Sequence, residues 1–133
     1  MSIPYSAFLA SKSHRDSDGG FAPLWMPDFL FDFQVALVEW AILKGRAALF
    51  ADTGLGKTPM QLVWAENVIR KTNRPVLILT PLAVSAQTER EAVKFCIDAK
   101  RSRTGKPQPN ISITNYEQLH HFDPDDFAGV VCD

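Results

Sequence analysis

Residues 51–58 form a pattern that could bind phosphate. They read Ala-Asp-Thr-Gly-Leu-Gly-Lys-Thr, which follows the general form G-x-x-x-x-G-K-S/T except that Ala51 replaces the first glycine. In such a loop the backbone N–H groups surround the phosphates of a nucleoside triphosphate, and the lysine reaches the β- and γ-phosphates. The hydroxyl that follows the lysine binds Mg²⁺. Lys57 and Thr58 are therefore the expected phosphate and Mg²⁺ ligands.

The segments on either side of this loop are those that phosphate binding requires. Residues 47–51 are a short apolar run typical of a strand covered on both faces, and residues 60–70 carry apolar side chains at helical spacing. A loop between a strand and a helix places phosphates at the helix N-terminus, where N–H groups are unpaired and the dipole is positive. The residues of the loop expected to bind the nucleotide are Thr53, Gly54, Leu55, Gly56, Lys57 and Thr58.

Two residues outside the loop could complete a nucleotide site. Asp133 follows the apolar run 129–132, and an acid at the end of a strand is where an NTPase with this loop holds Mg²⁺. Gln34 lies at the start of a predicted helix, and its amide could pair with the N6 and N7 atoms of adenine. We therefore expect Lys57 and Asp133 to be catalytic, Thr58 and Asp133 to hold Mg²⁺, and Gln34 to contact the base.

Hydrophobic periodicity predicts the helices that position these residues. A mostly buried helix is expected over residues 31–44, and a second from the loop to about Arg70. A third helix, which Ser85 could cap, is expected to extend to about Cys96. The apolar side of the first helix is expected to consist of Phe33, Leu37, Trp40 and Ala41, widened by Val38, Ile42 and Leu43.

Short apolar runs predict the strands. The runs at 76–80, 111–114 and 129–132 are unbroken, whereas residues 98–110 are polar and are expected to form an irregular excursion. A short helical turn is expected at 116–121. Strands that alternate with helices favour an α/β fold with a mostly parallel sheet flanked by helices.

Composition fits one domain of ordinary size. The chain has 133 residues, of which 46% are hydrophobic and 22% charged, enough for a buried core. Its net charge of −1 does not indicate a particular partner. Cys96 and Cys132 are interpreted as small buried residues of a protein in a reducing compartment. The sequence contains neither a stretch of membrane-spanning length nor a secretory signal, which favours a cytoplasmic location. Residues 1–20 are expected to be a flexible N-terminal segment, and 21–133 the domain.

In their order, these motifs resemble the first ATPase lobe of superfamily II helicases and translocases. The chain is most similar to Swi/Snf-type translocases and to the DEAD/DEAH-box helicases carried by bacteriophages. The resemblance covers residues 30–133. Its matching segments are Phe33-Gln34, the Walker A loop at 51–58, Thr80-Pro81-Leu82-Ala83-Val84 (motif Ia), Thr114-Asn115-Tyr116-Glu117 (motif Ib) and Val130-Val131-Cys132-Asp133 (the opening of Walker B).

The resemblance implies a partial RecA-like P-loop NTPase lobe with ATP and Mg²⁺ as cofactors. It implies that Gln34 reads adenine and that the chain contacts DNA through backbone phosphates, in a bacterial or phage-infected cell. Such phosphate contacts position a strand without reading its sequence. The residues implied in the DNA contact are Pro81, Leu82, Ser85, Thr114, Asn115 and Tyr116.

The sequence also departs from the family. A Glu that activates water after Asp133, a coupling motif and a second lobe with arginine fingers are missing from it. Because catalysis of phosphoryl transfer depends on positioning and electrostatics, we expect this chain to hydrolyse ATP very slowly or not at all. The first hypothesis is an N-terminal fragment of an ATP-dependent DNA helicase or translocase. The alternatives are a stand-alone ATP- or nucleic-acid-binding module without turnover and, less in keeping with motifs Ia and Ib, a P-loop kinase.

Overall fold

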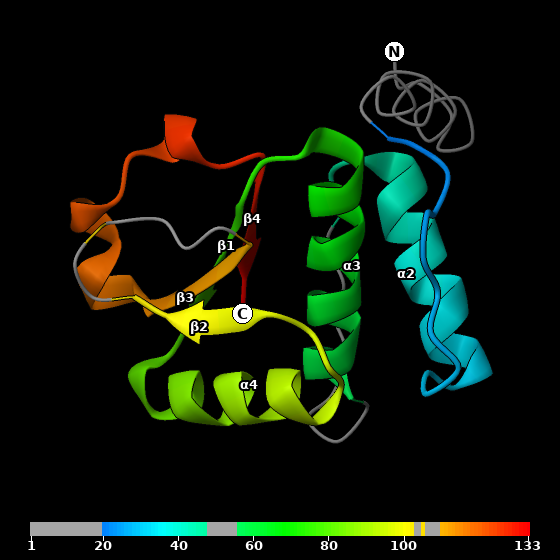
Figure 1. Ribbon diagram of the computed structural model, residues 1–133, viewed down its shortest axis with the longest axis horizontal. Helices are drawn as coiled ribbons and strands as arrows, with labels where there is room; N and C mark the ends of the chain where they lie inside the picture. Colours follow the sequence, from blue (N-terminus) through cyan, green and yellow to red (C-terminus); the bar gives the residue numbers. More distant parts are fainter. Residues whose placement is uncertain (1–19, 48–55, 103–104, 106–109) are drawn as a thin grey trace, which may run out of the picture.

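A parallel sheet is the centre of the structure, a computed structural model that describes residues 20–47, 56–102, 105 and 110–133 (Figure 1). The strand order is β2-β3-β1-β4, and all three pairings are parallel. The predicted α/β class, with a parallel sheet flanked by helices, is confirmed. The strands are β1 (Val76–Thr80), β2 (Ala99–Arg101), β3 (Ile111–Asn115) and β4 (Gly129–Cys132).

The helices follow the predicted order along the chain. They are α2 (Asp32–Lys44), α3 (Lys57–Thr72), α4 (Leu82–Lys94) and the 3₁₀ helices η2 (Tyr116–His121) and η3 (Pro124–Asp126). Gly45 ends α2 with a positive φ of 79°, which is favourable for glycine because it has no Cβ. Among the described residues, no helix combines the length and apolarity needed to cross a membrane.

Helix α3 lies between the sheet and α2, as Figure 1 shows. Its residues Leu62, Val63 and Ala65 are completely buried, because it packs against the sheet on one side and α2 on the other. A buried amide, Asn67, fixes the segment before α2 to this helix. Its Oδ1 accepts the N–H groups of Leu24 and Trp25 at 2.8 and 2.9 Å, and its Nδ2 donates to the carbonyl of Trp25 at 2.8 Å.

The two faces of the sheet are covered differently. Side chains that alternate along β1 and β3, such as Ile78 and Ile113, enter the large core beneath α3 and α4, and we call this side the helix-covered face. On the second face, Leu77 and Leu79 form a smaller cluster with Phe122 and Phe127. This second face has no long helix among the described residues, and its cover comes from η2, η3 and the segments next to them.

The predicted buried side of α2 is wrong in part. Phe33, Trp40 and Leu43 are 46%, 42% and 48% exposed. Val38, Ala41 and Ile42 are buried as expected, and Gln34 is buried with them. The expected stripe was displaced because the sequence offers apolar side chains around most of the helix. Packing against α3 determines which side of α2 is buried, and that side includes the polar residue Gln34.

Three smaller predictions are also corrected. Ser85 does not cap α4, because the helix begins three residues earlier, with Pro81 in the N-cap position. Cys96 and Cys132 are exposed rather than buried, since Cys96 follows the end of α4 and Cys132 lies on the second face of β4, the outermost strand among the described residues. The excursion at 98–110 contains strand β2.

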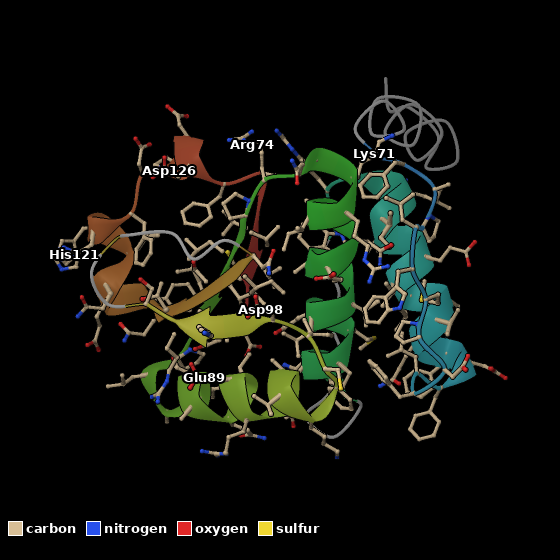
Figure 2. The ribbon with its side chains drawn as sticks, in the orientation of Figure 1. Lys71, Arg74, Glu89, Asp98, His121 and Asp126 are labelled. Carbon is tan, nitrogen blue, oxygen red and sulfur yellow. The ribbon has the colours of Figure 1, made fainter. Side chains whose placement is uncertain are left out.

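Strand β2 is held by polar contacts rather than by an apolar run, which is why periodicity missed it. Ala99 is its one buried residue, and Lys100 and Arg101 are exposed. Glu89 of α4 accepts the backbone N–H of Arg101 at 2.7 Å, and Figure 2 shows this glutamate on the side of α4 that faces the strand.

Several predicted features lie outside the described residues. These are the N-terminal segment 1–19, most of the predicted strand at 47–51, and the first five residues of the phosphate loop, with Thr53, Gly54 and Leu55 among them.

Candidate functional site

The predicted site residues that the structure describes gather at one edge of the sheet. Parallel strands bring their carboxyl ends to the same edge, and β1, β3 and β4 end there at Thr80, Asn115 and Cys132. The N-terminus of α3 reaches this edge as well, because the side chain of Lys57 meets that of Asp133.

Gly56 and Lys57 begin α3 in the manner that an anion site needs. Gly56 is the N-cap residue in the left-handed conformation (φ 72°, ψ 47°), which a residue with a Cβ rarely adopts. It has no side chain with which to satisfy the first N–H groups of the helix, and the first turn contains no acidic residue. The amino end of this 16-residue helix therefore offers N–H groups and a positive dipole to an anion.

Lys57 and Asp133 face each other across this end of the helix. Lys57 Nζ lies 3.8 Å from Asp133 Oδ1, and the two side chains are 37% and 16% exposed. At this distance and exposure the pair contributes little to stability. Both groups are accessible, so the arrangement can bind an anion through the ammonium group and a cation through the carboxylate. Thr58 follows Lys57 in the first turn of α3 and is half-buried.

Gln34 is buried beside the end of the loop. Only 4% of the residue is exposed. Its Nε2 donates to the carbonyl of Gly56 at 3.2 Å, and its Oε1 accepts the N–H of Phe31 at 2.9 Å. A Cβ at Gly56 would collide with the Gln34 amide. The start of α2 and the last turn of the loop are therefore held together by this one side chain.

Asp133 is fixed through its backbone. Its N–H donates to the carbonyl of Leu79 at 2.8 Å, which extends the pairing of β4 with β1. Its main-chain oxygen accepts the phenol O–H of Tyr116 at 2.7 Å. Burial of the hydroxyl and the nearby Cys132 and Asp133 raise the pKa of Tyr116 above its usual value, so the phenol is a hydrogen-bond donor at neutral pH.

The residues predicted to contact DNA divide into two groups. Pro81, Leu82 and Tyr116 are exposed, with Leu82 at 62% and Tyr116 at 44%. Ser85 is buried, and its hydroxyl lies 2.7 Å from that of Thr80.

Thr114 and Asn115 belong to the buried group. The Thr114 hydroxyl is enclosed without a hydrogen-bond partner among the described residues. Asn115 Oδ1 accepts the N–H of Gln118 at 3.1 Å and so caps η2. In this conformation Ser85 and Asn115 form hydrogen bonds inside the edge, and the predicted DNA contacts that are exposed are Pro81, Leu82 and Tyr116.

Sequence reasoning missed two contacts at this edge. The hydroxyl pair of Thr80 and Ser85 joins the end of β1 to α4, and a threonine at the end of an apolar strand was its one signal. Tyr116 was predicted to contact nucleic acid, but its bond to Asp133 had no signal, because the two residues are joined only by the order of the strands.

Comparisons of the chain with protein-family models, with curated proteins and with solved structures found no match. The described residues contain no cluster of three or more histidine, cysteine or acidic side chains suited to a metal ion. The candidate site therefore consists of Lys57 and Thr58 on α3, Asp133 beyond β4, and Gln34 and Tyr116 beside them.

Proposed function

We propose that this chain is the first ATPase lobe, of RecA-like type, of a superfamily II DNA helicase or translocase, and that it binds Mg·ATP. The observation that carries the proposal is the 3.8 Å approach of Lys57 Nζ to Asp133 Oδ1, between the amino end of α3 and the carboxyl end of β4. The two residues belong to separate motifs of the sequence, of which the first is expected to bind phosphate and the second Mg²⁺. We place the protein in the cytoplasm of a bacterial or phage-infected cell.

The residues present fit a triphosphate and its metal. ATP supplies the phosphoryl group, and Mg²⁺ neutralises charge on its β- and γ-oxygens. Lys57 would neutralise the same phosphates, while the Thr58 hydroxyl and the Asp133 carboxylate would hold the metal. The uncapped N–H groups of α3 would add their partial positive charge. In the resting arrangement Asp133 is the counter-ion of Lys57, a role that the phosphates would take over.

Gln34 is the proposed adenine contact. Its hydrogen bond to Gly56 places it next to Lys57. Because the residue is 4% exposed and both amide atoms are bonded, the base would pair with the amide only after these two bonds open. The exposed residues Pro81, Leu82 and Tyr116 line the same edge of the sheet and would follow a DNA backbone. Since Pro81 has no N–H, the phosphates would be contacted through the main-chain N–H of Leu82 rather than through the buried hydroxyls of Ser85 and Thr114.

Titration calorimetry of the purified chain with Mg·ATP tests the nucleotide site. We expect saturable binding that Lys57→Ala weakens at least tenfold, equivalent to about 1.4 kcal/mol or more. Lys94→Ala is the matched control, because this lysine is exposed in the last turn of α4. The affinity of this variant for Mg·ATP should equal that of the wild type. Equal affinity in the wild type and Lys57→Ala would overturn the proposal.

A phosphate-release assay separates the proposed helicase lobe from a stand-alone binding module. A module without turnover binds Mg·ATP but releases no phosphate in the presence of single-stranded DNA, even when the chain is extended after Asp133 by the Glu, coupling motif and second lobe of a related enzyme. The lobe of a helicase should release phosphate in response to DNA when it is extended in this way. Transfer of phosphate to a small acceptor would instead indicate a kinase.

A further inference from the structure

Tyr116 connects two strands that are not neighbours in the sheet. It is the first residue of η2, directly after β3, and its hydroxyl bonds to the residue directly after β4. Strand β1 lies between β3 and β4, so the tyrosine side chain passes over the carboxyl end of β1. The distance of 2.7 Å is that of a well-formed O–H···O hydrogen bond, and 44% of the residue is exposed.

This bond completes the placement of Asp133. The Leu79 carbonyl holds the N–H of Asp133 and the Tyr116 hydroxyl holds its main-chain oxygen, which fixes the backbone on both sides of the side chain. With its backbone fixed, the carboxylate points toward Lys57. Without the phenol, the second restraint on Asp133 would be lost while every other contact of the site stayed in place.

The backbone of Tyr116 belongs to η2, a helix that is capped by a hydrogen bond. Asn115 caps η2 through the N–H of Gln118, and Asn115 pairs in register with Thr80 at the end of β1. A ligand that presses on the exposed ring of Tyr116 therefore acts on a residue whose backbone is anchored and whose hydroxyl touches Asp133.

We propose that Tyr116 is a positioning residue that couples the surface facing DNA to the acid that holds Mg²⁺. This inference rests on the proposed function and goes beyond it, because it names one hydroxyl through which the two ligands influence each other. A DNA strand bound at Pro81, Leu82 and Tyr116 shifts or orders the phenol, and the phenol sets the position of Asp133. Mg·ATP bound at Asp133 has the reverse effect on DNA, as thermodynamic linkage requires.

Tyr116→Phe tests this coupling, since it removes the hydroxyl and keeps the ring. We would measure the affinity of the full chain for Mg·ATP with and without oligo-dT, and for oligo-dT with and without Mg·ATP. In the wild type each ligand should change the affinity for the other by the same factor, within the range of about 5–150-fold typical of allosteric coupling. In Tyr116→Phe the coupling factor should fall to nearly one, and this ratio is the readout whatever the change in each affinity measured alone.

Two controls make each outcome decisive. Tyr5→Phe removes the hydroxyl of the other tyrosine of the chain and should leave the coupling factor unchanged. Thermal unfolding of Tyr116→Phe shows whether the variant is folded at the titration temperature. A wild-type coupling factor that persists in Tyr116→Phe overturns the inference, and so does a wild type that binds both ligands independently, although the proposed function survives both results. A wild type that binds no Mg·ATP overturns both proposals.

Discussion

The two faces of the sheet differ in what covers them, although the same strands supply both. On the helix-covered face, Ile78, Ile111 and Ile113 have no exposed surface beneath α3 and α4. On the second face, Leu77 and Leu79 are also nearly buried, but their neighbour Val130 on β4 is 44% exposed. The aromatic rings of Phe122 and Phe127 replace a helix layer there.

The helix-covered face contributes most of the stability of the sheet, whereas the cover of the second face is next to the candidate site. Apolar area removed from water contributes roughly 25 cal/mol per Å², so most of the folding energy comes from the closed side. The second face is covered by segments that are also part of the candidate site, since η2 begins at Tyr116 and Tyr116 contacts Asp133. The thinner layer is the one that can move without unfolding the core.

The largest effect is expected from opening the helix-covered face. Ile78→Ala should lower the free energy of unfolding by about 3–4 kcal/mol, because its cavity would be surrounded by packed helices and cannot collapse. Urea unfolding followed by tryptophan fluorescence measures this change. Val93→Ala, at a side chain 73% exposed on α4, should stay within about 0.5 kcal/mol.

An intermediate effect is expected on the second face. Phe122→Ala removes more carbon atoms than Ile78→Ala, yet we expect a loss of about 2 kcal/mol, below the range of about 3–5 kcal/mol usual for phenylalanine in a closed core. The reason is that the cover formed by η2 and η3 can settle into the space. If the same urea experiment gave Phe122→Ala the larger loss, the second face would be as closed as the first.

The smallest effect is expected at Val130, which we compare with Val76 on the adjacent strand. Val76 has no exposed surface, whereas Val130 is 44% exposed. Val76 pairs with Gly129, the residue before Val130 on β4. Val76→Ala should cost about 2 kcal/mol, from two buried methyl groups at about 0.8 kcal/mol each plus a cavity term, and Val130→Ala about 0.5 kcal/mol. Equal losses in the two variants would remove the distinction between the faces.

The part of the fold that the sequence predicts well is the part with regular apolar patterns. The runs at 76–80, 111–114 and 129–132 became strands within one residue of the predicted bounds, because unbroken β-branched and leucine residues suit strands covered on both faces. Strand β2 was missed because three residues with two exposed charges have no such pattern, and its pairing depends on β3 and Glu89.

The candidate site was predicted in its residue types but not in its contacts. Lys57 and Asp133 were named from motifs, and their approach follows from strand order, which periodicity does not give. The burial of Gln34 and the bond from Tyr116 to Asp133 are contacts between distant segments. Local sequence carries no signal for such contacts, because they depend on how complete elements pack.

The position of β1 in the sheet has a consequence for the order of folding. Val76 pairs with Ile111 on one side and with Gly129 on the other, so both partners of the central strand are made long after it. Pairings between distant residues require large loops to close first, which makes parallel sheets slow to form. During synthesis on the ribosome, the edge of β1 that faces β4 must wait unpaired until the chain has reached residue 132 and cleared the exit tunnel. A chaperone that binds this apolar strand in the interval would cover a strand whose five residues are all buried in the finished sheet.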